Sequence, residues 1–342
     1  MRKEVRLNLV SLNKLRHALL GWYDQNRREL PWRRDADAYR VWVSEIMLQQ
    51  TRVAAVLGHY TQFMQRFPTA QALAAAREPS VLAAWSGLGY YHRARRMHQA
   101  AKSIARERQG RFPQTAKEWR ELPGIGRYSA AAIASIALGE AVAAVDGNVE
   151  RVLERMFGCG EGREAVWHRA ERLLDRERPG DFNQALMDLG ATLCTPRAPQ
   201  CPLCPLYAWC KSRGAETIRP QVARKRRQLC YTLVRDKGAV LLVRRPAEAS
   251  LMAGMWELPV IPECRRDGQK PVAKLRHSIT DTDYEISVIS LSPEELPSFL
   301  TGARWFSRKQ WERLPLTGLA RKVLRRLVDE SSSELKESKG LR

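Results

Sequence analysis

Residues 12–209 have the periodicity of α-helices along almost their whole length. Apolar side chains recur three and four positions apart, as in Leu12, Leu15, Leu19 and Trp22, and this spacing gathers them on one helix face. Few runs in this part of the chain alternate between apolar and polar residues. Short breaks that contain proline or glycine separate the helical stretches. The pattern predicts an all-α domain of short helices over residues 1–214.

The pattern changes after residue 214. Short β-rich runs occur at 229–234, 239–243 and 284–291, and the residues at 319–328 have the pattern of a terminal helix. We therefore predict a second domain of the α+β class over residues 228–328. Residues 219–227 carry five positive charges and no negative one, which indicates an exposed basic linker over 215–227. The polar segment 329–342 is expected to be a disordered tail.

The charge of the chain points to a polyanionic partner. Its 342 residues include 58 Lys+Arg and 37 Asp+Glu, so the formal net charge is +21. The length favours about two domains, and a hydrophobic content of 44% is that of a folded protein. The charge therefore does not come from a basic tail alone, and nucleic acid is the first candidate partner.

Membrane and secretory classes are excluded by the same sequence. The mostly apolar stretch at 130–138 is far shorter than the roughly 20 residues that a membrane helix needs. Residues 1–10 are too charged for a signal peptide. We expect a monomer in the cytoplasm, associated with the nucleoid if the source is bacterial. In such a reducing compartment, clustered cysteines are metal or cluster ligands rather than disulfides.

Four of the seven cysteines lie close together as C-x6-C-x2-C-x5-C. They are Cys194, Cys201, Cys204 and Cys210. Four thiolates at this spacing can enclose one four-iron cluster or one zinc ion, and the prolines between them keep the loop non-helical. The spacing does not decide between iron and zinc, and a group of unligated thiols is the alternative. Four cysteine ligands leave no open position for a substrate.

A glycine-containing turn lies between two helical stretches at Leu122-Pro123-Gly124-Ile125-Gly126-Arg127-Tyr128. The glycines allow a tight hairpin whose backbone N–H groups approach a phosphate at the start of the next helix. Such a hairpin would hold the DNA backbone without reading sequence. An ordinary corner between two helices is the alternative.

Two carboxylates far apart in sequence are candidates for acid and base chemistry. Glu45 shares one helix face with Trp42 and Gln49, so it could lie in a partly dry pocket where its pKa rises. The alternative is a solvated glutamate on a surface helix. Asp146 precedes a helical stretch, and there its commoner use is as a helix N-cap.

Six motifs occur in a fixed order within residues 12–212. They are Leu30-Pro31-Trp32-Arg33, Ser44-Glu45-Ile46-Met47-Leu48-Gln49-Gln50-Thr51, Gly87-Leu88-Gly89-Tyr90-Tyr91, the hairpin at 122–128, Val145-Asp146-Gly147-Asn148-Val149 and the cysteine array. As a set they resemble the MutY-type adenine DNA glycosylases of the helix-hairpin-helix, endonuclease III-like superfamily. The resemblance implies a 4Fe-4S cluster on the four cysteines. It also implies that the hairpin holds DNA through Gly124, Gly126 and Arg127.

The resemblance also implies a substrate and a set of residue roles. The substrate is duplex DNA with adenine opposite 8-oxoguanine or guanine, and the adenine is flipped out of the stack before base excision. Glu45 would protonate adenine N7, and Asp146 would stabilise the positive charge on the sugar or capture it transiently. The other implied roles belong to Tyr128 and Asn148 (orienting groups), Arg33 and Gln184 (contacts to the flipped base), and Gln49 and Tyr90 (filling the stack beside 8-oxoguanine).

Position 128 bears on a second activity. Lyase members of the superfamily have lysine here, whose amine forms a Schiff base with the sugar. This chain has Tyr128, so we expect base removal without an efficient lyase step. Mismatch-specific thymine glycosylases also have tyrosine at this position. A thymine or uracil mismatch glycosylase is therefore the nearest alternative, and a non-catalytic lesion-binding protein is another.

The C-terminal domain resembles the Nudix-like domain by which MutY proteins recognise 8-oxoguanine. The resemblance rests on the motifs at 240–246, 251–259 and 314–320, and no Nudix hydrolase box is present in the sequence. We expect this domain to bind the lesion without hydrolysing a nucleotide. The family loop Phe-Ser-His is altered here, so Ser278, Ile279 and Thr280 are the candidate contacts. Asp281 would repel phosphate.

Overall fold

The computed structural model describes residues 8–158, 162–214, 224–249, 251–261, 270–279, 281–296 and 302–337. The chain divides into two compact units. The first comprises Met1–Ala75 and Arg96–Arg219, and the second comprises Ala76–Arg95 and Pro220–Arg342. The boundary is therefore not a single point in the sequence, because 20 residues of the helical part of the chain pack with the C-terminal part.

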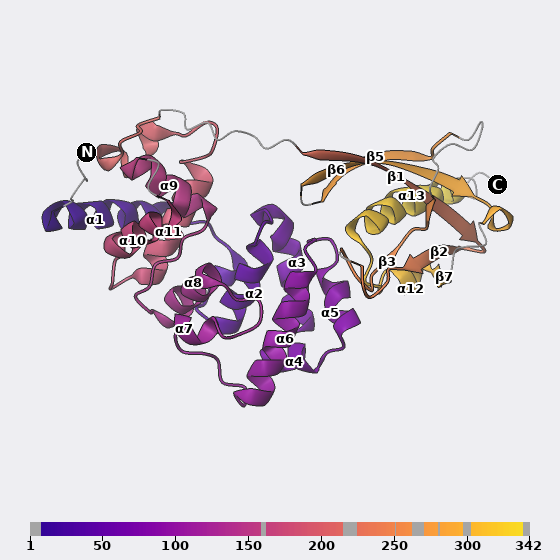
Figure 1. Ribbon diagram of the computed structural model, residues 1–342, viewed down its shortest axis with the longest axis horizontal. Coiled ribbons are helices and arrows are strands. Elements are labelled where there is room, and N and C mark those ends of the chain that lie inside the picture. The colour runs from indigo at the N-terminus through magenta and orange to yellow at the C-terminus, as the bar shows by residue number, and fades with distance from the viewer. Residues whose placement is uncertain are drawn as a thin grey trace. The chain divides into compact units, whose positions relative to one another are not determined.

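The first unit is helical, as the periodicity predicts (Figure 1). Its elements are α1 (Leu9–Asn26), η1 (Pro31–Arg33), α2 (Ala38–Leu48), α3 (Val53–Arg66), α4 (Ala70–Ala75), α6 (His92–Glu107), α7 (Ala116–Trp119), α8 (Arg127–Leu138), α9 (Gly147–Phe157), α10 (Arg163–Leu173), α11 (Pro179–Thr192), η2 (Cys201–Leu203) and η3 (Tyr207–Trp209). By the division given above, α6 has its first residues in the second unit. None of the described helices is long and apolar enough to cross a membrane.

Local signals explain where several of these helices begin. The side chains of Asn8, Asp37 and Thr115 accept backbone N–H groups at the starts of α1, α2 and α7, which satisfies donors that have no partner within the helix. Proline starts α11, where its fixed φ suits the first turn. The apolar faces of α1, α8, α9, α10 and α11 form one core, and this core supports the residues described below.

The second unit contains α5 (Glu78–Trp85) and a seven-stranded sheet. The strands are β1 (Lys225–Asp236), β2 (Ala239–Arg244), β3 (Trp256–Glu257), β4 (Val260–Ile261), β5 (Ala273–Ile279), β6 (Thr282–Leu291) and β7 (Ala303–Ser307), followed by α12 (Arg308–Trp311) and α13 (Gly318–Glu337), with η4 (Pro293–Glu295) before β7. The main strand order is β3-β2-β1-β6-β5, and β1 runs parallel to β6. The apolar side of α13 packs on one face of the sheet, beside Leu233 and Val240 (Figure 1). The expected α+β class of this part of the chain is confirmed.

Two predicted boundaries differ from the structure. Strand β1 begins at Lys225, inside the predicted 215–227 linker, because residues 225–227 pair with Thr282–Tyr284 of β6. Helix α13 continues to Glu337, beyond the predicted end at 328 and into the predicted tail. Residues 329–337 contain neither proline nor glycine, so nothing in their sequence stops the helix. Residues 215–223 and 338–342 lie outside the described residues.

Candidate active site

Glu45 lies on the inner side of α2 and is almost completely buried, with 6% of its surface exposed. Its pKa is raised from 4.5 to about 7, chiefly because burial disfavours the charged form. A hydrogen bond from Tyr128 and the charge of Arg33 lower the pKa, whereas the charge of Asp146 raises it. The alternative of a solvated surface glutamate is therefore wrong. A carboxyl with this pKa can donate a proton near neutral pH.

Tyr128 lies in the first turn of α8 and points to Glu45. Its hydroxyl donates to Glu45 Oε2 at 2.8 Å. Burial raises the pKa of the Tyr128 hydroxyl well above 10, and the nearby charge of Glu45 raises it further. The hydroxyl therefore keeps its proton and fixes the orientation of the Glu45 carboxyl, which leaves Oε1 to carry the carboxylic proton.

Asp146 is the N-cap of α9, as its sequence context predicts. Its Oδ1 accepts the backbone N–H groups of Asn148 and Val149 at 2.9 and 2.8 Å, and its Oδ2 accepts the Asn148 side-chain amide at 2.9 Å. Burial raises the pKa of Asp146, although these hydrogen bonds act in the opposite direction. The Asp146 carboxylate therefore both caps α9 and is the candidate catalytic group, and its capping hydrogen bonds hold it in one orientation.

Arg151 fixes Asn148 from the next turn of α9. Its guanidinium donates to Asn148 Oδ1 at 2.8 Å and to the carbonyl oxygens of Gly190 and Cys194 at 2.6 and 2.8 Å. This arginine is not among the residues predicted from the sequence. Its position three residues after Asn148, on the same helix face, is the signal that could have found it.

Arg33 is held by a buried acid that the sequence analysis missed. The side chain of Asp188 in α11 is 1% exposed and accepts two hydrogen bonds from Arg33, at 2.7 and 3.0 Å, and others from Arg28. Burial raises the pKa of Asp188, but the two arginines outweigh burial and the pKa is lowered. Asp188 is therefore ionised. It holds the guanidinium of Arg33 in place, and the charge of Arg33 lowers the pKa of Glu45.

The other residues predicted to contact the flipped base or to fill the DNA stack are Gln49, Gln184 and Tyr90. Gln49 ends α2, and its amide donates to Ser129 Oγ of α8 at 3.0 Å. Gln184 donates to the Gly180 carbonyl at 3.3 Å. Tyr90 belongs to the second unit and has a left-handed backbone with φ of 48°.

The predicted hairpin connects α7 to α8. Gly124 has φ of 82°, and a Cβ atom there would lie 2.6 Å from Arg96 Cβ, so only glycine fits. Gly126 is the N-cap of α8. The Arg127 side chain pairs with Glu164 at 2.8 Å and lies over the Trp167 ring, which leaves the backbone N–H groups as the candidate phosphate contacts.

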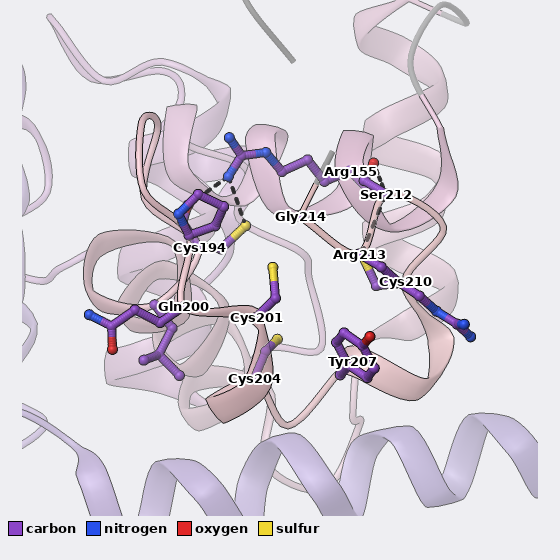
Figure 2. Close-up of a pocket in the computed structure, with 12 residues that line it drawn as sticks. Arg155, Cys194, Gln200, Cys201, Cys204, Tyr207, Cys210, Ser212, Arg213 and Gly214 are labelled. Atoms are coloured by element: carbon purple, nitrogen blue, oxygen red, sulfur yellow. Dashed lines mark hydrogen bonds between the residues drawn. The ribbon is translucent and has the colours of Figure 1, made fainter. Parts of the chain in front are cut away.

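The cysteine array folds around one pocket, as Figure 2 shows. Cys194, Cys201, Cys204 and Cys210 all line it, and none of these four is in a disulfide. Burial raises the pKa of Cys201, and it raises that of Cys204 to about 11. Arg155 donates to Cys194 Sγ at 3.4 Å. Within the described part of the chain, no group of three or more His, Cys, Asp or Glu residues is arranged to hold a metal ion.

The predicted lesion loop lies at the β5–β6 turn. Ser278 Oγ donates to Asp283 Oδ1 at 2.6 Å, and Ile279 ends β5 opposite Thr282. Asp281 pairs with Lys225 at 3.3 Å, which offsets part of the repulsion that this carboxylate would exert on phosphate. Thr280 lies outside the described residues.

Comparisons with known proteins identify the family of this chain. The family model described as HhH-GPD superfamily base excision DNA repair protein matches residues 43–176. The chain is 35% identical to the adenine DNA glycosylase of Homo sapiens over 93% of its own length and 74% of the human protein.

Two solved structures are similar to a part of the chain. A thermostable thymine-DNA glycosylase matches with a TM-score of 0.55 and 29% identity, covering 59% of this chain and 97% of that chain. A non-covalent endonuclease III–DNA complex matches with a TM-score of 0.53 and 22% identity, covering 61% and 97%, and this similarity concerns the fold alone. From the family model and the extended similarity to curated relatives, the chain belongs to the adenine DNA glycosylases of base excision repair.

Proposed function

We propose that this glycosylase excises adenine by general acid catalysis from Glu45, with Asp146 stabilising the charge that develops on the sugar. The observation that carries the proposal is the buried Glu45 carboxyl, whose pKa is about 7 and whose Oε2 is fixed by Tyr128. An ordinary glutamate would be almost fully ionised at neutral pH and could not donate. Burial therefore supplies the acid that the reaction needs.

The proposed reaction has two steps. The Glu45 proton moves to adenine N7, the C1′–N9 bond breaks, and its electron pair leaves with the base. The cationic sugar is stabilised by the Asp146 carboxylate, which its hydrogen bonds to Asn148 and Val149 hold in place. Water then adds to C1′, and its proton returns to Glu45. Two carboxyl groups in unlike surroundings thus divide the acid and anion roles.

We assign no lyase step to this site. Schiff-base chemistry needs an amine at the sugar, whereas the residue in this position is Tyr128, whose hydroxyl is engaged with Glu45. The other assignments follow the family pattern. Arg33 and Gln184 contact the flipped base, and Gln49 and Tyr90 occupy the vacated stack. The hairpin at Gly124 and Gly126 holds phosphate through backbone N–H groups, and the charge of +21 supplies affinity without sequence preference.

The C-terminal sheet is proposed to be a Nudix-like lesion reader that contacts 8-oxoguanine through Ser278, Ile279 and Thr280. Ser278 already makes a hydrogen bond at the exposed β5–β6 turn, and a hydroxyl there can exchange Asp283 for a polar edge of the lesion. The preferred substrate is then adenine opposite 8-oxoguanine, with adenine opposite guanine next. We propose that one protein molecule, acting as a monomer, binds either mismatch. We also propose that the protein acts on DNA in the cytoplasm or the nucleoid.

We further propose that the four cysteines hold a 4Fe-4S cluster. The four thiols line one pocket within a short loop, and four thiolates placed in this way can enclose a four-iron cluster. Zinc is the alternative occupant, and the measured iron and zinc contents distinguish the two. When bound, the cluster would fasten the loop at 194–210 to α9 and would take no part in cleaving the bond.

The experiment is base release under single turnover by purified protein whose iron and zinc contents have been measured. Three duplexes that differ only at the mismatch carry adenine opposite 8-oxoguanine, adenine opposite guanine, and thymine opposite guanine. We expect rates to fall in that order, with no release of thymine and no strand cleavage before alkali treatment. Absence of adenine release by iron-loaded protein would contradict the proposal, and thymine release would support the thymine-glycosylase alternative.

A further inference from the structure

The turn that carries Tyr90 is part of the second unit and is strained. Gly87, Gly89 and Tyr90 have φ of 113°, 71° and 48°. Glycine adopts such angles freely, but a tyrosine does so at an energetic cost, because its Cβ crowds the backbone. A residue in this conformation persists only where its surroundings fix it. The contacts around the turn therefore determine whether Tyr90 is presented in this form.

Part of this support is local. Arg93 is 5% exposed, and its guanidinium donates to the carbonyl oxygens of Leu88 and Gly89, both at 3.3 Å. It also lies 5.4 Å from the Trp85 ring centre and 5.3 Å from that of Tyr90. Arg93 therefore joins the backbone of the turn to the ring of Tyr90.

Further support comes from the C-terminal part of the chain. The carbonyl oxygen of Leu316, a fully buried residue, accepts hydrogen bonds from Ser86 Oγ at 2.7 Å and from the Tyr91 hydroxyl at 3.1 Å. Arg321 of α13 donates to Ser86 Oγ at 2.8 Å. These groups flank the turn on both sides, at positions 86 and 91. We call Ser86, Tyr91, Leu316 and Arg321 the anchor.

The anchor is continuous with the sheet that precedes α13. Trp256 of β3 donates its backbone N–H to the Pro315 carbonyl, and it accepts the Thr317 N–H at its own carbonyl, both at 2.9 Å. Leu316 is thereby held between two backbone hydrogen bonds. Buried hydrogen bonds of this kind are costly to leave unmade, so displacement of residues 314–318 would change the environment of Ser86 and Tyr91.

We propose that the anchor is the connection through which the C-terminal sheet holds Tyr90 ready to enter the DNA stack, and that Ser86, Tyr91 and Arg321 are positioning residues for this step. The inference rests on the proposed stacking role of Tyr90. It gives the C-terminal sheet a second task, which is to set the conformation of the residue that enters the DNA beside the lesion.

The test compares Tyr91→Phe and Arg321→Met with Arg326→Met, which removes the same charge from an exposed position of α13. Amide exchange at residues 86–91 is measured in the free, full-length protein. Insertion is measured in a Glu45→Gln background from the emission of 2-aminopurine placed beside 8-oxoguanine, because this probe brightens when it is unstacked. Single-turnover adenine release is measured with Glu45 intact. Tyr91→Phe deletes one hydroxyl and keeps the ring, so it carries the test if Arg321→Met impairs folding.

We expect faster exchange, a smaller rise in emission and release slowed by about five- to tenfold in both anchor variants, with none of these changes in Arg326→Met. Exchange and emission at the control level in Tyr91→Phe would overturn the proposal. Tyr90→Ala separates the two ideas. Normal emission and release in that variant would contradict the role of Tyr90 itself. If emission and adenine release are reduced in Tyr90→Ala but normal in Tyr91→Phe, the role of the anchor is contradicted and the role of Tyr90 is not.

The double variant Tyr90→Ala/Arg321→Met supplies the final measurement. If Arg321 acts through Tyr90, the double variant releases adenine no more slowly than Tyr90→Ala alone. Additive losses would overturn the proposal, because they would show that Arg321 acts by another route.

Discussion

Glu45 and Asp283 carry the same chemical group, but their surroundings move its pKa in opposite directions. Glu45 is buried beside Tyr128, and burial raises its pKa to about 7. Asp283 is partly exposed at the β5–β6 turn, where hydrogen bonds from Ser278 and Arg224 lower its pKa. The proposed catalytic pocket keeps a proton because its carboxyl is buried, whereas the proposed lesion loop keeps its charges paired at the surface. Substitutions in the pocket should therefore have much larger effects than matched substitutions in the loop.

The largest effect is expected for Glu45→Gln. This variant keeps the size and hydrogen-bonding capacity of the side chain but removes the transferable proton. Adenine release should fall by about a thousandfold or more, as for the loss of a general acid, while binding to the mismatched duplex is retained. Release is measured under single turnover and binding by titration with a labelled duplex. Turnover near the wild-type rate would rule out Glu45 as the acid.

Asp188→Asn tests whether the buried network supports the pocket. The variant leaves Arg28 and Arg33 without their shared carboxylate, so we expect a loss of about 3 kcal/mol in the free energy of unfolding and release slowed by about tenfold or more. The matched control is Asp24→Asn, because Asp24 pairs with Arg178 at the surface and should cost less than about 1 kcal/mol. Urea unfolding measures the free energy of unfolding of both variants. Equal losses would contradict the prediction that the buried ion pair contributes more to stability than the surface pair.

Tyr128→Phe should change the pH dependence of release. The Tyr128 hydroxyl lowers the pKa of Glu45, so its removal raises that pKa above about 7. Because the acid must be protonated to act, activity falls as the pH rises through this pKa, and the fall moves to higher pH in the variant. We expect a slower maximal rate, by about tenfold. A pH–rate profile from pH 5 to 9 measures the shift, and an unchanged or lowered basic limb would contradict it.

Ser278→Ala should have the smallest effect. The side chain is at an exposed turn and donates to Asp283, which can find water instead. We expect the preference for 8-oxoguanine over guanine to fall by about twofold to fivefold, with stability unchanged within about 0.5 kcal/mol. The ratio of single-turnover rates on the two duplexes measures this preference. A loss of activity as large as that of Glu45→Gln would mean that the loop belongs to the chemistry.

The helices and the two-part organisation could be predicted because periodicity and capping are local properties of the sequence. The burial of Glu45 could not, because the face it shares with Trp42 and Gln49 does not reveal what packs against it. The partner, Tyr128, is 83 residues away. The two interpretations of Asp146 were compatible, since one carboxylate caps α9 and also faces the candidate site.

Asp188 was missed for a similar reason. It stands between Met187 and Leu189 in an apolar stretch of α11, and an acid there is a signal of a buried ion pair. Its partners, however, precede it by about 160 residues. The start of β1 inside the predicted linker has the same origin, because Lys225 is in a strand only through its pairing with Thr282. Local patterns do not contain such long-range partners.

The division of the chain also has a consequence for biosynthesis. Ser86 and Arg321, which bond each other, are separated by 235 residues. At a translation rate of about 5 to 20 residues per second, this separation corresponds to roughly 10 to 50 seconds. During that interval Ser86 and Tyr91 have left the ribosome without Leu316 and Arg321, their hydrogen-bond partners. Truncated chains that end before α13 would therefore lack Arg321, which bonds Ser86, and a nascent chain should become protease-resistant around Tyr90 only after α13 has emerged.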